Sequence, residues 1–425
     1  MNRMVKALIL AIVPAFALSA VPCHTIAAGR NASDVAKLKQ VVNELNSNGA
    51  NFSTNVETDY AYTWDKDGSL ESIDWTGHGV KGDVTIPSFN KLKTIQFSVY
   101  ESLQSLVVED NKSLENIFCY GQEDYNDENG YENYQINKLQ IKGCTNLKSL
   151  NVSCAGKIEN SSNGLDLSKY TNLDEINIYS CNLGSIDVSH NRKLTRLDVK
   201  NSKIKELDLS NNKKLETLCL DLNDISVLDI RNNPDISYIS IHSMPCTEIY
   251  FTTLKKLENL WCSNTKIKKL DLRDAVKLTS LYCPDGMLED GGLLLGKKPE
   301  LTRIICRGNK NLKSLDLSGC TELERLNCGN CGLTQLDLSQ TVNLSYLYCS
   351  NNNLEELNTS ALPGLKTLNC SNNRLVSLDL SNNNKLSKLL CKGNKITELD
   401  LSNCSKLVKK DADYFTFDAK TEIIQ

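Results

Sequence analysis

Seven cysteines recur at one position of a repeating unit, and they are the first residues whose type and spacing could do chemistry. Neighbouring members of the set are 21 to 23 residues apart. Thiols at regular spacing could hold a metal ion, form disulfides or take part in redox reactions. The seven are Cys262, Cys283, Cys306, Cys328, Cys349, Cys370 and Cys391.

Strand geometry favours a structural role for these thiols. Aligned side chains on parallel neighbouring strands keep their Cβ atoms near the strand spacing, which is wider than the ~3.8 Å that a disulfide prefers. Free cysteine packs as a small hydrophobe. We therefore predict a ladder of reduced, buried thiols that holds no metal, and we expect outward-facing Cys219 to react fastest. The same buried role is expected at turn positions for Cys144, Cys181, Cys320, Cys331 and Cys404.

Three carboxylates could also do chemistry. Glu175, Asp198 and Asp221 fall on neighbouring units, where a carboxylate pair could cleave a glycoside. Lys200 lies among them, so ordinary ion pairing explains the set as well. The sequence has no nucleophile motif, and its four histidines are far apart in the repeat. We expect no enzyme activity, no cofactor and no metal.

These residues are positioned by an internal repeat of mostly 21 residues, seen clearly from 365 to 386. Strand alternation turns Leu368 and Cys370 inward and Asn369 outward, while Asn373 can satisfy turn backbone groups. A fixed period of this length indicates a leucine-rich repeat solenoid: a horseshoe of about fifteen coils, each with a short parallel strand on the concave face. Coils are expected to start at Leu70, Leu92, Leu114, Leu147, Leu173, Leu194, Leu215, Ile236, Leu257, Leu278, Leu301, Leu323, Leu344, Leu365 and Leu386.

The chain divides into four segments. Residues 1–28 read as a signal peptide, because the apolar run after Lys6 is shorter than a membrane span and contains Pro14. Residues 29–69 should form an N-terminal cap helix and linker, since an open solenoid end would expose its core. The solenoid covers 70–406, with outward insertions at 121–135 and 155–162, and 407–425 form a C-terminal cap.

The repeat Leu365-Lys-Thr-Leu368-Asn-Cys370-Ser-Asn-Asn373 resembles bacterial internalin-like leucine-rich repeats, particularly those with a cysteine ladder. The resemblance covers about residues 70 to 410. It implies a secreted or surface protein of the adhesin or host-interaction type that binds other macromolecules. The chain departs from surface-anchored relatives because it shows no sortase-type motif and no stalk domain after the repeats.

Outward strand residues are the candidate binding site, because exposed aromatics and arginine are typical of protein interfaces. They gather on the coils that start between Ile236 and Leu344. A protein ligand is favoured over a glycan, and the alternatives are a passive envelope scaffold or a glycan-active enzyme. The candidate residues are Tyr238, His242, Trp261, Tyr282, Arg303, Ile305, Arg307, Arg325, Tyr346 and Tyr348.

The distribution of charged residues and the acidic insertion at 121–135 bear on which kind of partner the protein could bind. Residues 29–135 hold 18 acidic against 8 basic side chains, and residues 136–425 hold 34 against 38. Without a basic stripe or a polybasic patch, neither nucleic acid nor membrane is expected as a partner, and the mature protein should be a monomer. Tyr125, Tyr131 and Tyr134 make the acidic insertion an alternative binding loop. A calcium site there fits poorly, because the glycine falls one place late for an EF-hand.

Overall fold

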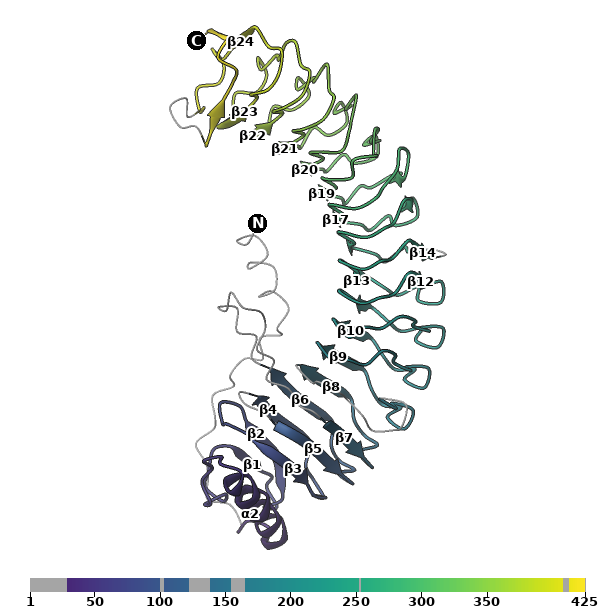
Figure 1. The fold of residues 1–425 in the computed structure, drawn as a ribbon, viewed down its shortest axis with the longest axis vertical. Coiled ribbons are helices and arrows are strands. Elements are labelled where there is room, and N and C mark those ends of the chain that lie inside the picture. Colours follow the sequence, from purple (N-terminus) through teal and green to yellow (C-terminus); the bar gives the residue numbers. More distant parts are fainter. Residues whose placement is uncertain are drawn as a thin grey trace.

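The computed structural model describes residues 29–99, 103–121, 138–153, 165–251, 254–407 and 413–424. They form an open arc of stacked coils with a continuous sheet along its inner, concave side (Figure 1). That sheet has 17 strands, and leaving out antiparallel β1 and terminal β25 gives 15 parallel strands, one for each expected coil. The leucine-rich repeat horseshoe that the sequence predicts is confirmed.

The concave strands are longer near the N-terminus and mostly three residues long from β11 onward. Each pairs in register with the strand of the next coil, so equivalent residues form straight columns across the sheet. In chain order the strands are β2 (Leu70–Trp75), β4 (Thr94–Val99), β6 (Asn116–Gly121), β8 (Ser149–Ser153), β9 (Glu175–Tyr179), β10 (Arg196–Lys200), β11 (Thr217–Cys219), β13 (Tyr238–Ser240), β15 (Asn259–Trp261), β17 (Ser280–Tyr282), β19 (Arg303–Ile305), β20 (Arg325–Asn327), β21 (Tyr346–Tyr348), β22 (Thr367–Asn369) and β23 (Lys388–Leu390).

The interior of the arc follows the predicted strand phase. Leu368 and Cys370 are fully buried, whereas Asn369 is partly exposed on the concave face. Asn373 closes the turn after this strand: its amide nitrogen donates to the carbonyls of Cys349 at 3.0 Å and Cys370 at 2.9 Å. Its amide oxygen accepts the Leu354 N–H at 3.1 Å. The buried amide therefore ties three pieces of two neighbouring coils together.

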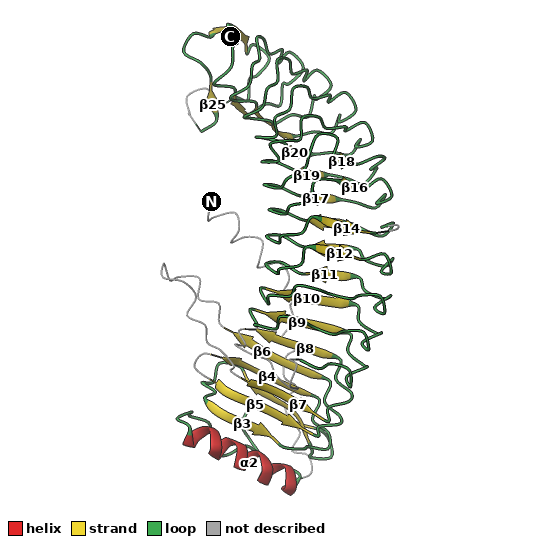
Figure 2. Ribbon diagram, turned by 45° about the vertical axis from the view of Figure 1, so that its right-hand side comes forward, coloured by secondary structure: helices red, strands yellow, loops and turns green. Residues whose placement is uncertain are grey.

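Helix α2 (Ala32–Ser47) lies at the N-terminal end of the arc, where it covers the first coil (Figure 2). Asn31 caps it by accepting the Ser33 and Asp34 N–H groups at 3.0 and 3.1 Å. Asp34 in turn accepts the Leu70 N–H at 3.0 Å, which ties the helix to β2. Its apolar face, spaced three and four residues apart, is buried against the core, and the residues are Leu38, Val41, Val42 and Leu45.

The return side of the coils carries only short pieces of sheet. Three strands pair near the N-terminus, and two-stranded pieces follow farther along the arc (Figure 2). The arc ends at β25, whose Phe415 stacks on Phe417 with ring centroids 4.9 Å apart. The remaining strands are β1 (Tyr62–Trp64), β3 (Gly82–Ile86), β5 (Leu103–Glu109), β7 (Lys138–Lys142), β12 (Val227–Asp229), β14 (Glu248–Tyr250), β16 (Leu270–Asp271), β18 (Leu293–Leu294), β24 (Glu398–Asp400), β25 (Phe415–Thr416) and β26 (Glu422–Ile424).

Candidate functional site

The concave sheet places the sequence-predicted binding residues in adjacent columns. The first column runs through Tyr238, Arg303, Arg325 and Tyr346, with other residues between them. The middle column includes Trp261, Tyr282, Ile305 and Tyr348. All ten candidate residues are partly or well exposed. Eight lie on six neighbouring concave strands, β13, β15, β17, β19, β20 and β21, and His242 and Arg307 follow two residues after β13 and β19.

Three aromatic side chains on this face touch one another across the strands. The Trp261 ring lies between Tyr238, at a centroid distance of 5.6 Å, and Tyr282, at 6.0 Å. Both ring pairs are tilted, an arrangement that favours aromatic packing. Because β13, β15 and β17 are bonded in register, the three rings form a continuous, half-exposed apolar strip.

Arginines follow the aromatic strip along the arc. The Arg325 guanidinium lies over the Tyr346 ring, 4.4 Å from its centroid. Arg307 is paired with Asp285, with Nη2 and Oδ2 3.0 Å apart. Arg303 stands directly opposite Arg325 in the register of β19 and β20, and it is exposed.

A charged cluster on the preceding strands was only partly foreseen. Asp198 is buried and lies 2.9 Å from the Arg196 guanidinium and 3.4 Å from the Lys200 ammonium. Asp221, also buried, is 3.6 Å from Lys200 and 3.2 Å from the His242 ring. The sequence drew attention to Asp198, Asp221 and Lys200. The role of Arg196 was missed, although the alternation Arg-x-Asp-x-Lys in β10 places all three charges on one face.

Hydrogen bonds and nearby opposite charges stabilise the ionised forms of Asp221 and Lys200. Burial opposes charging of Asp221, yet hydrogen bonds from His242 and Ser240, with the nearby Lys200, hold the pKa of its carboxyl below its usual range. Ser240 Oγ donates to it at 2.6 Å. Burial likewise opposes the charge of Lys200, but Asp198 raises the pKa of its ammonium. The acidic and basic side chains of this cluster pair with one another, so the cluster has a structural role. Glu175 lies beside the cluster and is exposed.

Cys219 corrects one expectation. It points to the concave face, as predicted, but it is completely buried and is therefore not an exposed, fast-reacting thiol. Burial and the nearby Asp198 and Asp221 carboxylates raise the pKa of its thiol far above the usual range. The strand phase was predicted correctly, but strand phase alone does not give the exposure of a side chain this small.

The inward cysteines are buried thiols on neighbouring coils. None of the 15 cysteines in the described residues is in a disulfide, and all of them are buried. Burial raises the pKa of the Cys328 and Cys349 thiols well above the usual range and that of Cys391 to about 12. Within the described part of the chain, no group of three or more His, Cys, Asp or Glu side chains could hold a metal.

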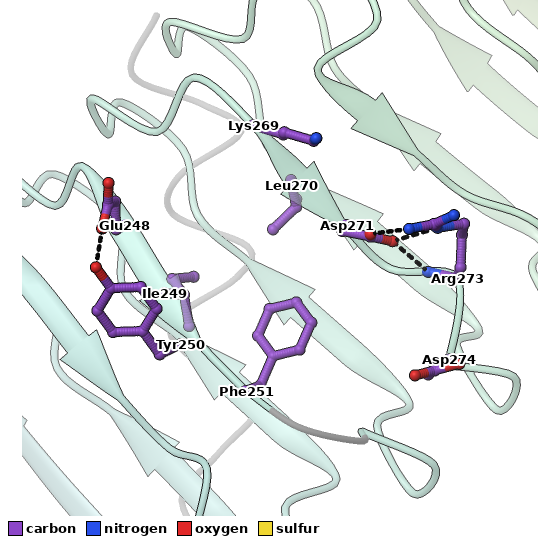
Figure 3. Close-up of a pocket in the computed structure, with 9 residues that line it drawn as sticks. All are labelled: Glu248, Ile249, Tyr250, Phe251, Lys269, Leu270, Asp271, Arg273 and Asp274. Carbon is purple, nitrogen blue, oxygen red and sulfur yellow. Dashed lines mark hydrogen bonds and ion pairs between the residues drawn. The ribbon is translucent and has the colours of Figure 1, made fainter.

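A groove of about 540 Å³ lies on the return side, where one coil departs from the repeat (Figure 3). The neighbouring coils carry Asp229 and Asp271, whose carboxylates accept the N–H two residues on at 3.1 and 3.2 Å. Tyr250 takes the equivalent place in β14 and is exposed, with Phe251 beside it. No signal in the leucine spacing predicted this groove.

Some predicted features lie outside the described residues. These are the signal peptide at 1–28, most of the insertion at 121–135 with Tyr125, Tyr131 and Tyr134, and the insertion at 155–162. Among the residues that are described, no helix is long and apolar enough to cross a membrane.

The solved structures that resemble the chain are leucine-rich repeat proteins. The functional domain of InlJ from Listeria monocytogenes, which includes a cysteine ladder, is 28% identical, with a TM-score of 0.51. The match covers 62% of this chain and 62% of that one, so this chain spans less than two thirds of the InlJ domain. The buried thiols fit the same internalin-like arrangement.

Two more distant structures share the fold. A leucine-rich repeat protein of Leptospira interrogans is 17% identical over 77% of this chain and 90% of its own, with a TM-score of 0.56. The ectodomain of the Arabidopsis thaliana receptor kinase GASSHO1/SCHENGEN3, solved with CASPARIAN STRIP INTEGRITY FACTOR 2, is 18% identical over 87% and 52%, with a TM-score of 0.53. No protein-family model matches the sequence, and the curated proteins give no match. The fold therefore defines the class of protein as a leucine-rich repeat protein.

Proposed function

We propose that the chain is an exported leucine-rich repeat protein, secreted or held at the cell surface, that binds a protein partner through its concave face. The observation that carries the proposal is the half-exposed strip of Tyr238, Trp261 and Tyr282, whose rings contact one another on adjacent strands. Large aromatic side chains dominate binding energy where water is excluded. A protein that docks there would cover apolar surface that otherwise faces solvent.

Export and a host-interaction role of the adhesin type are supported by two observations. The N-terminal sequence has a basic start and an apolar run of signal-peptide length. The similarity to InlJ extends to a ladder of buried cysteines. Catalysis is not part of the proposal, because the two buried carboxylates of the concave face are already paired with Arg196 and Lys200.

Trp261→Ala tests the docking surface. A partner is first captured from host extracellular extracts by the mature protein, in parallel with a glycan array, and its affinity is then measured for the variants. Removal of the central ring should weaken binding by ~2 kcal/mol or more, about thirtyfold in Kd, without lowering the melting temperature. Tyr282→Ala should act in the same direction.

Two return-side changes and one deletion are the controls. Asp379→Ala, at an exposed return-side position, should leave affinity unchanged. Tyr250→Ala probes the groove, and deletion of residues 123–133 probes the acidic insertion. If Tyr250→Ala or the deletion abolishes binding while the Trp261→Ala variant still binds, the strip of Tyr238, Trp261 and Tyr282 is not the docking surface. Saturable binding on the glycan array alone would replace the protein partner by a glycan.

A further inference from the structure

Three arginines share the first column of the concave sheet, but they differ in what stands beside them. Arg196 has Asp198 two residues along the same strand, on the same face, and the two side chains form an ion pair at 2.9 Å. In the equivalent place Arg303 has Ile305, and Arg325 has Asn327. The later arginines therefore lack the internal carboxylate that neutralises Arg196.

Arg303 and Arg325 stand directly opposite each other on β19 and β20. Like charges in this relation repel, which destabilises the sheet locally. Throughout the described ranges of the chain, no carboxylate lies within ion-pair distance of either side chain. The charges of Arg303 and Arg325 are therefore available to a ligand, whereas Asp285 neutralises the charge of Arg307.

The groups around the two arginines are arranged to donate hydrogen bonds. Stacking on Tyr346 orients the Arg325 guanidinium and leaves its N–H edges free of protein acceptors. Asn327 uses its amide oxygen to accept the Gly329 N–H at 3.3 Å, so its amide nitrogen remains as a donor. Ser280, opposite Arg303 on the other side, adds a hydroxyl. A ligand that only accepts hydrogen bonds and carries negative charge fits such a set.

We propose that Arg303 and Arg325 form a carboxylate-binding site for an acidic side chain of a protein partner. The inference rests on the proposed function, in which the concave face is the docking surface. A protein segment fits better than a sulfated glycan, because the adjacent column presents Ile305 and Tyr282, an aliphatic and an aromatic surface that suit an apolar side chain. The partner segment would thus place an acidic residue beside an apolar one.

A short fluorescein-labelled peptide of alternating Glu and Leu is the probe, and its Kd is measured by fluorescence anisotropy. Arg303→Gln and Arg325→Gln should each weaken binding about tenfold, the effect of losing a charge-assisted hydrogen bond. Added salt should weaken binding to the wild-type protein. The same peptide with Gln in place of Glu should not bind.

Asn327→Asp is the sharpest variant, because it places a carboxylate two residues after Arg325, as Asp198 stands after Arg196. The new carboxylate should occupy the guanidinium and reduce peptide binding as much as Arg325→Gln does, while the protein keeps its melting temperature. Arg192→Gln is the matched control: this arginine is exposed, lies on a turn and has no ion pair among the described residues. It should leave peptide affinity unchanged.

The outcomes separate this inference from the proposed function. If Arg303→Gln and Asn327→Asp bind the peptide as the wild-type protein does, or if heparin binds and the peptide does not, the carboxylate site is wrong. If both variants lose the peptide while Trp261→Ala still binds the captured partner normally, the site stands and the proposed docking surface fails.

Discussion

Two regions of the same concave sheet differ in whether their arginines are paired with carboxylates of the protein. On β10 to β13, buried Asp198 and Asp221 neutralise Arg196 and Lys200 within the protein. On β19 to β20, Arg303 and Arg325 face each other without a carboxylate. The backbone is equivalent in both regions, so a substitution at one column position decides whether an arginine stabilises the fold or remains available to a ligand.

The largest expected effect tests the neutralised region. Asp198→Ala should lower the free energy of unfolding by about 3 kcal/mol, because it leaves the half-buried Arg196 without its counter-charge and Lys200 with Asp221 alone. Arg303→Gln should change it by less than ~0.5 kcal/mol, since that side chain is exposed and unpaired. Urea unfolding at pH 7 measures both changes. Similar values for the two variants would remove the distinction between the regions.

A smaller effect concerns pH, through Asp221. The pKa of its carboxyl is lowered in the folded state, so its stabilising contribution is present above the unfolded pKa of about 3.9 and is lost as the pH falls through the folded value. The difference in urea midpoint between the wild-type protein and Asp221→Asn should therefore shrink as the pH drops below about 4. A difference that grows toward acid pH would mean that the cluster destabilises the fold.

The sequence predicted the coils and the strand phase, because leucine spacing is set by burial within each coil. Leu368 inside and Asn369 outside follow directly from the two-residue alternation. Cys219 shows where this reasoning ends: its direction was predicted correctly, but its burial depends on the neighbouring coils. The groove at Tyr250 also depends on how two coils fit together, which no single repeat contains.

The interior of the arc also changes along its length. In the turns before β10, β11 and β13, the buried side-chain amide oxygens of Asn191, Asn212 and Asn233 accept no hydrogen bond. Farther along the arc, Asn383 occupies the equivalent position of its repeat, but its amide oxygen accepts a hydrogen bond from Thr359 Oγ1 at 2.7 Å. Val188 and Thr359 occupy equivalent positions in the repeat. The Asn212 amide nitrogen donates to the Val188 carbonyl, just as the Asn383 amide nitrogen donates to the Thr359 carbonyl.

Val188→Thr should therefore stabilise the protein, by about 0.5 to 1 kcal/mol. The new hydroxyl can donate to Asn212 Oδ1, as Thr359 donates to Asn383. Val199→Thr is the matched control, because Val199 is equally buried but the nearby Asn223 oxygen already accepts from Ser202 and Ile204. That change should cost stability, since it buries a hydroxyl without a free side-chain acceptor. If both variants lower the urea midpoint equally, a hydroxyl does not repair the unsatisfied amide of Asn212, and the turns before β11 and β23 do not differ in the way argued above.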